Sequence, residues 1–373
     1  MKNQTKLLIS LLLVSSSLHA FMRLGEGNID LTLDVSTYYD SEIRGQDEGL
    51  DDLIFTASPG LQYSRQSRNF GIDASAGVTF VKYADNDQFD DENFFFDLSF
   101  TPGARMETSR FVISGDLILS NETRTEESVG NIVTVLTYGA SGSVTYNPNS
   151  KYSLIGGVSY SREDPDSDLF SEKDQYGASL TLEVPVSETT NSRIGVSYGK
   201  TESDTSVTDN DTFTYFVGLS GNLLPKVSGS IDVGIQQQKL DSGKDEKSPY
   251  LSAGLQWSAS ERTQVALDAS KSFGTTIDDR TSESLSFSVT GSHQLTRAWS
   301  VNVFAGYIED DYSGPGPLDN RTDEETFVGA GTSYQLVEWG SIGLDIRYSD
   351  QSSSESTFEY DRLRVGINFS GQW

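Results

Sequence analysis

Apolar and polar residues alternate with a period of two along almost the whole chain, and this pattern restricts the fold more than any other feature. Neighbouring residues of a β-strand face opposite sides of a sheet, so Leu31, Leu33 and Val35 share one face and the polar residues between them share the other. No apolar stripe at helical spacing is evident after residue 20. The alternation recurs in about eighteen stretches, near 27–39, 52–64, 69–83, 93–104, 110–120, 132–146, 151–161, 175–186, 192–200, 212–222, 226–238, 248–258, 262–273, 284–294, 298–308, 326–336, 340–349 and 357–373.

The connections between these stretches alternate between short and long. Asn147-Pro148-Asn149-Ser150 and Leu224-Pro225 are short, whereas 162–174 and 309–325 are long. Transmembrane β-barrels have short turns at one rim and longer loops at the other, and bacterial single-chain barrels have an even number of strands. We therefore predict an all-β fold, a transmembrane antiparallel β-barrel of about 18 strands, with 16 or 20 as alternatives. A soluble β-sandwich is the competing fold.

The first twenty residues have the layout of a secretory signal peptide. Lys2 and Lys6 precede the apolar run 7–14, and the segment ends at Ala20, where we expect cleavage. The run is too short to span a bilayer as a helix, which needs about 20 residues. No linker divides the remaining chain, so we expect one barrel domain over 21–373.

Charge is distributed unequally between the two kinds of connection. The chain carries 27 Lys+Arg and 55 Asp+Glu, a formal net charge of -28, which argues against nucleic acid as a partner. The acids concentrate in the long connections, whereas the short ones are flanked by residues such as Arg105 and Lys151. We expect an outer-membrane protein of a Gram-negative-type cell, in contact with membrane lipid, with acidic loops outside and both termini in the periplasm.

The alternation also predicts which charged residues face the lumen. Around eighteen strands leave an aqueous lumen rather than a filled core. The alternative is that these charges pair with one another on adjacent strands. The segment 309–325 is a candidate for folding inward, although exposure at the surface is what we expect of it. The predicted lumen-facing residues are Asp73, Asp97, Asp116, Glu183, Asp232, Asp268, Asp345, Arg347, Arg362 and Arg364.

No arrangement of residues predicts an enzyme or a cofactor. His293 is the only histidine after the signal peptide, and its neighbour Ser292 faces the opposite side of the strand, so we predict no catalytic residue. Carboxylates in the long connections are oxygen ligands suited to weak binding of calcium or magnesium, although none forms a complete calcium loop. These weak candidates are Asp85, Asp87, Asp90, Asp91, Asp164 and Asp166.

The last strand carries a second pattern. Leu363, Val365, Ile367 and Phe369 alternate toward a terminal Trp373. This resembles the C-terminal recognition signal of outer-membrane barrels, which implies the barrel-assembly machinery as a partner.

The first hairpins resemble a known family. The resemblance runs through 31–40 (LTLDVSTYYD), 56–61 (TASPGL) and 71–75 (GIDAS), and departs from the family at 39–42 (YDSE). The chain is similar there to outer-membrane β-barrel porins that are often associated with exopolysaccharide export. This resemblance implies a barrel in the outer membrane and supports fold and location more than substrate.

Two functions follow from these observations. The first is passage of polar solutes or exopolysaccharide across the outer membrane through the barrel. The alternative is a non-conducting surface barrel whose acidic loops bind polysaccharide, divalent cations or partners.

Overall fold

The alternating stretches all form strands in the structure, a computed structural model that describes residues 22–46, 49–149, 151–167, 169–204, 209–241, 243, 245–314 and 320–373. The predicted signal peptide lies outside the described residues. The strands are β1 (Met22–Leu24), β2 (Gly27–Asp40), β3 (Asp52–Gln66), β4 (Phe70–Tyr83), β5 (Asp91–Pro102), β6 (Phe111–Glu126), β7 (Asn131–Asn149), β8 (Tyr152–Pro165), β9 (Lys173–Pro185), β10 (Thr190–Ser203), β11 (Asn210–Leu224), β12 (Val227–Leu240), β13 (Asp245–Ser260), β14 (Thr263–Thr275), β15 (Thr281–Gln294), β16 (Trp299–Ser313), β17 (Thr322–Val337), β18 (Gly340–Ser353) and β19 (Tyr360–Gln372).

Strands β2 to β19 form one closed antiparallel barrel of 18 strands, as the alternation predicted. Each strand pairs with the next along the chain, and the last pairs with the first in a register that runs from Arg364 opposite Asp40 to Gln372 opposite Thr32. Closure removes the free edges that an open sheet would expose. The short β1 forms a hairpin with the start of β2.

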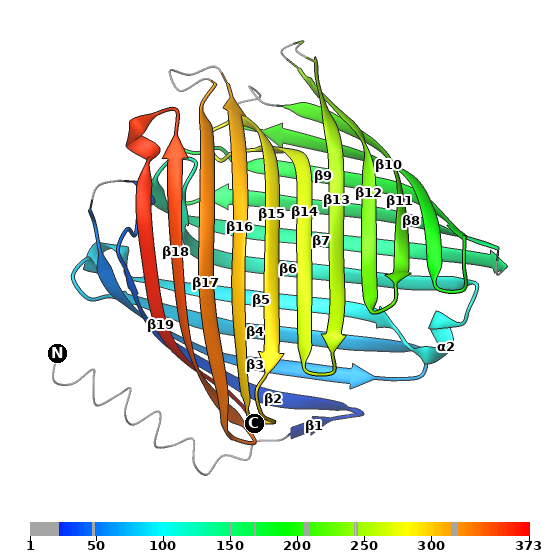
Figure 1. The fold of residues 1–373 in the computed structure, drawn as a ribbon, viewed down its shortest axis with the longest axis horizontal. Helices are drawn as coiled ribbons and strands as arrows, with labels where there is room; N and C mark the ends of the chain where they lie inside the picture. The colour runs from blue at the N-terminus through cyan, green and yellow to red at the C-terminus, as the bar shows by residue number, and fades with distance from the viewer. Residues whose placement is uncertain are drawn as a thin grey trace.

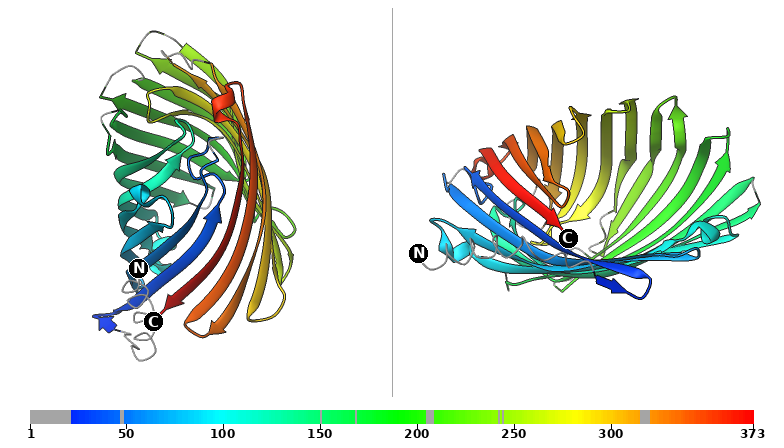
Figure 2. Two further views of the ribbon diagram at one scale, coloured as in Figure 1. Left: turned by 90° about the vertical axis from the view of Figure 1, so that its left-hand side faces the viewer. Right: turned by 90° about the horizontal axis from the view of Figure 1, so that it is seen from below.

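The barrel has two ends, which we name by the strands that finish there. Every even-numbered strand from β2 to β18 finishes at the loop end, and every odd-numbered strand from β3 to β19 finishes at the turn end, where the C-terminus lies (Figure 1). The wall of β10 to β19 stands across the wall of β3 to β9, and the walls curve round to meet at both sides (Figure 2).

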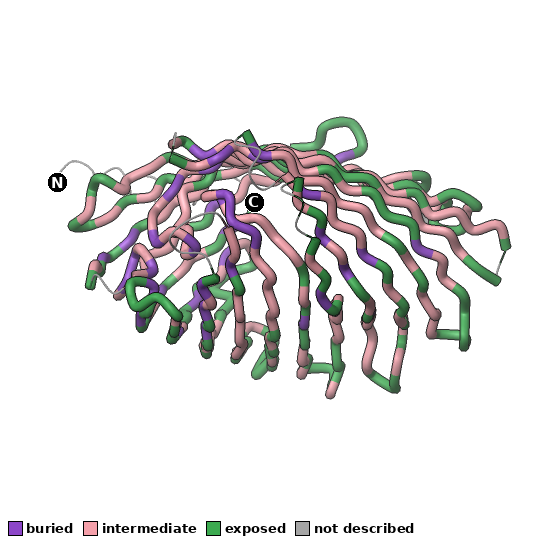
Figure 3. Tube along the Cα trace, turned by 90° about the horizontal axis from the view of Figure 1, so that it is seen from above, coloured by how far each residue is buried: buried purple, intermediate pink, exposed green. Residues whose placement is uncertain are grey.

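The outer face of the wall is apolar and exposed. Val303 is 60% exposed, and Ile235, Val217 and Leu344 are likewise exposed. A soluble protein would bury such a band, whereas lipid covers it in a membrane barrel. Most residues of the wall are half-buried or exposed, and the buried residues gather toward one side of the barrel in the view of Figure 3.

The strands extend further toward the loop end than the alternation indicated. The segment 121–131 was predicted as a loop, but β6 continues to Glu126 and β7 begins at Asn131. Likewise, most of 239–247 belongs to β12 and β13. The reason is that side-chain alternation reports the border of the lipid, whereas backbone hydrogen bonds between strands continue beyond it into water.

Helices are a minor part of the fold. A single turn, α2 (Ala104–Glu107), lies between β5 and β6 at the turn end, and two 3₁₀ turns cover Asp87–Phe89 and Ser356–Phe358. Over the described ranges, no helix is long and apolar enough to cross a membrane.

Candidate functional site

The inner face of the wall is identified by a contact that crosses the barrel. Arg362 on β19 lies 3.5 Å from Glu127, in the turn after β6, five strands away around the wall. Such a contact is possible only through the lumen. Residues in register with Arg362 on successive strands share its face, and this face carries all ten residues that the alternation assigned to the lumen.

Three of those residues lie together. Asp73, Asp97 and Asp116 belong to the neighbouring strands β4, β5 and β6 and line one pocket of about 180 Å³. Their hydrogen bonds come from neutral groups: Gln66 Nε2 donates to Asp73 at 3.4 Å, Ser75 Oγ to Asp97 at 3.3 Å and Ser141 Oγ to Asp116 at 3.1 Å. Within the described part of the chain, no Lys or Arg forms an ion pair with any of the three. They therefore hold negative charge facing the lumen.

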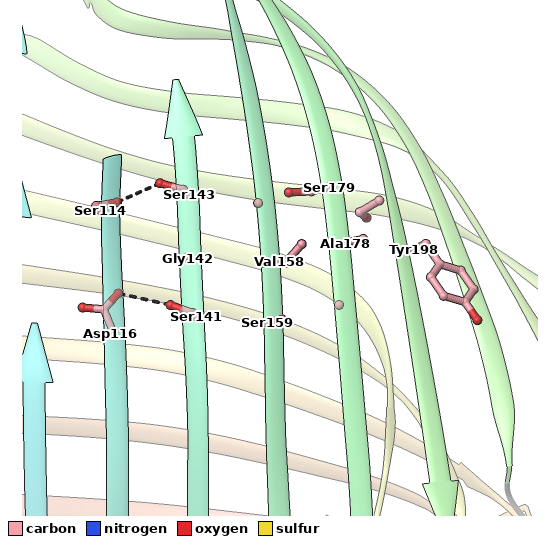
Figure 4. Close-up of a pocket in the computed structure, with 13 residues that line it drawn as sticks. Ser114, Asp116, Ser141, Gly142, Ser143, Val158, Ser159, Ala178, Ser179 and Tyr198 are labelled. Carbon is pink, nitrogen blue, oxygen red and sulfur yellow. Dashed lines mark hydrogen bonds between the residues drawn. The ribbon is translucent and has the colours of Figure 1, made fainter. Parts of the chain in front are cut away.

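Beside them, the inner wall of β6 to β10 is a surface of small hydroxyl side chains (Figure 4). Ser114 and Ser143 bond to each other at 2.7 Å, and Ser141 bonds to Asp116. The groove that they line has a volume of about 360 Å³. Because these side chains are short, they do not fill the lumen beside this wall and leave the wall accessible to water.

Glu183 and Asp232 are joined by a residue that the sequence reasoning missed. Arg193 on β10 contacts Glu183 at 3.2 Å and Asp232 at 2.7 Å. Its register is opposite Glu183, on the same face. The alternation on β10, the strand after the one that carries Glu183, already places Arg193 on the inner face.

The arginines of the last strands also have partners, but different ones from those expected. The alternative prediction, that inward charges pair on adjacent strands, holds for these arginines, but their partner is not Asp345. Instead, Arg362 and Arg364 both bond to Asp40 at 2.7–2.9 Å, and Arg347 bonds to Glu325 at 2.9 Å.

Asp40 was missed because the first strand was predicted to end at residue 39. The inward positions Asp34, Ser36 and Tyr38 continue to Asp40 in the same register. Asp268 and Asp345 lie on the inner face opposite glycines, Gly254 and Gly331 respectively, and form no ion pair with the described residues.

The loop end is crossed by loop residues that contact one another inside the barrel. Ile277, in the connection after β14, packs against Val133 and Val135 of β7, seven strands away. Arg280 and Arg321 both donate to the carbonyl oxygen of Ser128, at 2.6 and 2.8 Å. These contacts narrow the lumen at this end.

The segment 309–325 differs from its prediction. Residues 309–313 and 322–325 are strand, and residues 315–319 lie outside the described ranges. The side chain of Arg321 is fully buried rather than exposed, and it stacks on Phe358 with its guanidinium carbon 3.6 Å from the ring centroid.

Three of the six weak metal candidates border one groove, but they form no metal-binding cluster among the described residues. Asp90 forms an ion pair with Lys82 at 2.6 Å, and Asp91 accepts hydrogen bonds from Thr123 and Thr134. Asp164 and Asp166 line a groove of about 920 Å³ at the loop end, which Asp91 also borders. Among the described residues, no group of three or more His, Asp or Glu could hold a metal ion. Divalent binding stays a prediction.

The residues of the predicted assembly signal lie on the lipid face of β19. Val365 and Ile367 are exposed there, and Leu363 and Phe369 share their register. Trp373 stacks on Trp339, with ring centroids 5.0 Å apart. His293 bonds through Nδ1 to Thr263 Oγ1 at 2.9 Å near the turn end.

A closed 18-strand barrel with an apolar outer face and a polar inner face defines a porin-like barrel of the outer membrane. The chain belongs to the family described as "Putative beta-barrel porin 2", whose profile matches residues 22–373. Membrane barrels of porin families are typically not enzymes. No curated protein matches the sequence.

Solved barrels share this fold at low sequence identity. OpdK of Pseudomonas aeruginosa, solved with vanillate, has a TM-score of 0.53 and 11% identity, over 92% of this chain and 99% of that one. OccAB4 of Acinetobacter baumannii has a TM-score of 0.50 and 12% identity, over 94% and 99%. OpdO of Pseudomonas aeruginosa has a TM-score of 0.50 and 13% identity, over 93% and 97%. At such identities the likeness concerns the fold alone.

Proposed function

We propose that the protein is a channel that passes polar solutes or exopolysaccharide through the outer membrane. The observation that carries this proposal is the inner face, where Asp73, Asp97 and Asp116 face the lumen beside a wall of serines. A barrel with a structural role alone has no need of unpaired charge inside, because burying charge without a partner is costly. Water that fills the lumen would solvate these carboxylates.

The channel is tested by conductance of the purified barrel in planar bilayers. We expect discrete steps of current across a range of salts and voltages. The matched variant replaces 276–280, which crosses the lumen at the loop end, with a shorter connection. A barrel that stays silent in both forms at every salt and voltage contradicts the channel.

The rival function is a non-conducting surface barrel whose acidic loops bind polysaccharide, divalent cations or partners. One observation favours it, namely that loop residues contact one another across the lumen at the loop end. Silence of both channel forms, together with binding of labelled polysaccharide or calcium to intact cells, is the result that this function predicts.

We further propose that the loop end faces the cell exterior and that the turn end, with the C-terminus, faces the periplasm. Short turns at the periplasmic rim are general in such barrels. An epitope inserted at Gly243, between β12 and β13, is expected to react with antibody on intact cells, whereas one inserted at Pro225, between β11 and β12, is not. The opposite result reverses the orientation. The predicted signal peptide, and the C-terminal signal read by the assembly machinery, belong to the same proposal.

A further inference from the structure

The connection between β14 and β15 (276–280) is a compact unit. Arg280 N–H donates to Thr276 Oγ1 at 3.1 Å, Thr276 N–H donates to the Arg280 carbonyl at 2.8 Å, and Arg280 Nε bonds to Asp278 at 2.7 Å. Asp279 has a φ of 58°, a left-handed conformation that Asp tolerates better than most residues. Such a turn keeps its own shape whether or not it touches the rest of the barrel.

Besides packing on Tyr312 of the neighbouring β16, the turn makes contacts across the lumen. Asp279 accepts hydrogen bonds from Ser171 Oγ and from Ser203 Oγ, the second at 2.7 Å. Ser203 ends β10, four strands from β14, and Ser171 lies in the connection before β9, five strands away. Ser171 N–H also donates to the Ile277 carbonyl at 3.0 Å. The turn is therefore tied to the opposite side of the mouth.

The arrangement that ties the turn across the lumen has a cost. Lys173, at the start of β9, is 1% exposed, and its ammonium group has no hydrogen-bond partner among the described residues, although Asp279 and Glu163 attract it electrostatically. Arg280 Nη1 is also buried without a partner. Buried donors without partners destabilise the arrangement that buries them, so they favour a state in which water reaches them.

Release of the turn leaves the wall intact. The strands around it are held by continuous antiparallel pairing, from Thr263 opposite His293 to Thr275 opposite Thr281 between β14 and β15. The cross-lumen contacts of the turn are instead a few hydrogen bonds and the small apolar cluster around Ile277. Local opening occurs where few contacts must break.

We propose that 276–280 is a latch that holds the loop end of the channel closed, and that the channel conducts when Asp279 and Ile277 detach from Ser171. This inference rests on the proposed channel function. It assigns a gating role to a described loop and to named contacts, and the chain's lack of cysteine makes a cross-linking test clean.

The test locks the latch with a disulfide. In Ser171→Cys/Asp279→Cys, oxidation is expected to abolish the conductance of the purified full-length barrel in planar bilayers, and reduction of the same preparation is expected to restore it. The matched control is Ser270→Cys/Ser286→Cys, whose hydroxyl oxygens lie 2.8 Å apart on the adjacent strands β14 and β15. Oxidation of the control is expected to leave the conductance unchanged.

A second variant opens the latch. Asp279→Ala removes the acceptor of two hydrogen bonds and is expected to raise the open probability by at least about tenfold, because the loss of a single hydrogen bond to a charged group already corresponds to about that factor. Folding of each variant is checked by its heat-dependent shift in gel mobility. If neither oxidation nor Asp279→Ala alters the conductance, the proposed latch is wrong but the proposed channel function is unaffected. Silence of every variant in every state overturns both.

Discussion

At the scale of single residues, Asp40 joins the two ends of the barrel. It lies on the first barrel strand, is 1% exposed, and bonds to both Arg362 and Arg364 on the last. Because β2 and β19 are joined only when the barrel closes, these ion pairs stabilise the seam that closure creates. Alternation alone would place Asp40 on the inner face but would not identify its partners.

Replacing Asp40 is expected to weaken that seam. Asp40→Asn removes the counter-charge that Arg362 and Arg364 share and leaves Arg362 only its longer contact with Glu127. Breaking a buried ion pair costs about 3–5 kcal/mol of the free energy of unfolding. The measurement is the temperature at which the folded band in gel electrophoresis converts to the unfolded band. Asp34→Asn is the matched control, because Asp34 lies on the same strand and face but is exposed. Equal losses of stability in the two variants would show that the ion pairs of Asp40 do not stabilise the seam.

We expect Glu127 to make the loop end sensitive to pH. Burial by the loops and the nearby charge of Glu325 raise the pKa of the Glu127 carboxyl. The Glu127 side chain is still 42% exposed, and this exposure limits the size of the rise. A raised pKa means that the closed arrangement takes up a proton at a higher pH than a freely exposed glutamate does. Closed contacts therefore gain stability as pH falls through this raised pKa.

We expect conductance to decrease as pH falls toward the ordinary range of glutamate, about 4.3. The Glu127→Gln variant, which lacks the titrating group, should show a weaker dependence. Single-channel recording over a pH series measures both. An increase in open probability on acidification, or an identical dependence in Glu127→Gln, would show that Glu127 does not control the loop end.

At the scale of strands, large rings on the inner wall lie over glycines of the neighbouring strand. Phe95 of β5 lies opposite Gly77 of β4, Phe216 covers Gly195, and Phe327 covers Gly306. A Cβ at Gly77 would lie 2.6 Å from the Phe95 ring and 2.8 Å from the Pro59 carbonyl oxygen. The alternation cannot predict this pairing, because it depends on register between strands.

Gly77→Ala is therefore expected to destabilise the barrel by about 1–3 kcal/mol, as overpacking does. Thermal unfolding followed by circular dichroism measures the loss. Gly254→Ala is the control, since its Cβ would meet nothing closer than Asp268 Oδ1 at 3.5 Å. Equal stability of the two alanine variants would argue against steric restriction at Gly77.

At the scale of the whole molecule, we expect the inner carboxylates and the acidic loops to set the ion preference of the proposed channel. The described inner face carries Asp73, Asp97 and Asp116 without ion pairs, and the chain has a net charge of -28. Both attract cations. Loop charges in open water are screened when the Debye length falls to about 10 Å at 0.1 M salt, whereas charges inside a lumen are screened less.

We expect a cation preference, measured as the reversal potential across a salt gradient. The triple variant Asp73→Asn/Asp97→Asn/Asp116→Asn should lose most of the preference that remains at high salt. The control triple, Asp51→Asn/Asp211→Asn/Asp361→Asn, changes acids that tyrosine hydroxyls contact at the loop end and should affect mainly the preference at low salt. An anion preference in the native chain would contradict the charge argument.

The sequence alone determined the class of fold, an even strand count near eighteen and the face on which most strand residues lie. These depend on local periodicity, which a single strand carries by itself, and on an even strand count that closure requires. It also placed all ten candidate residues on one face.

Only the tertiary structure decided which charges meet and which loop crosses the lumen. Asp40 and Arg362 are far apart in sequence and adjacent only across the closing seam, and Ile277 reaches β7 only because the wall curves back on itself. Contacts of this kind depend on closure and register. No periodicity within one strand carries that information.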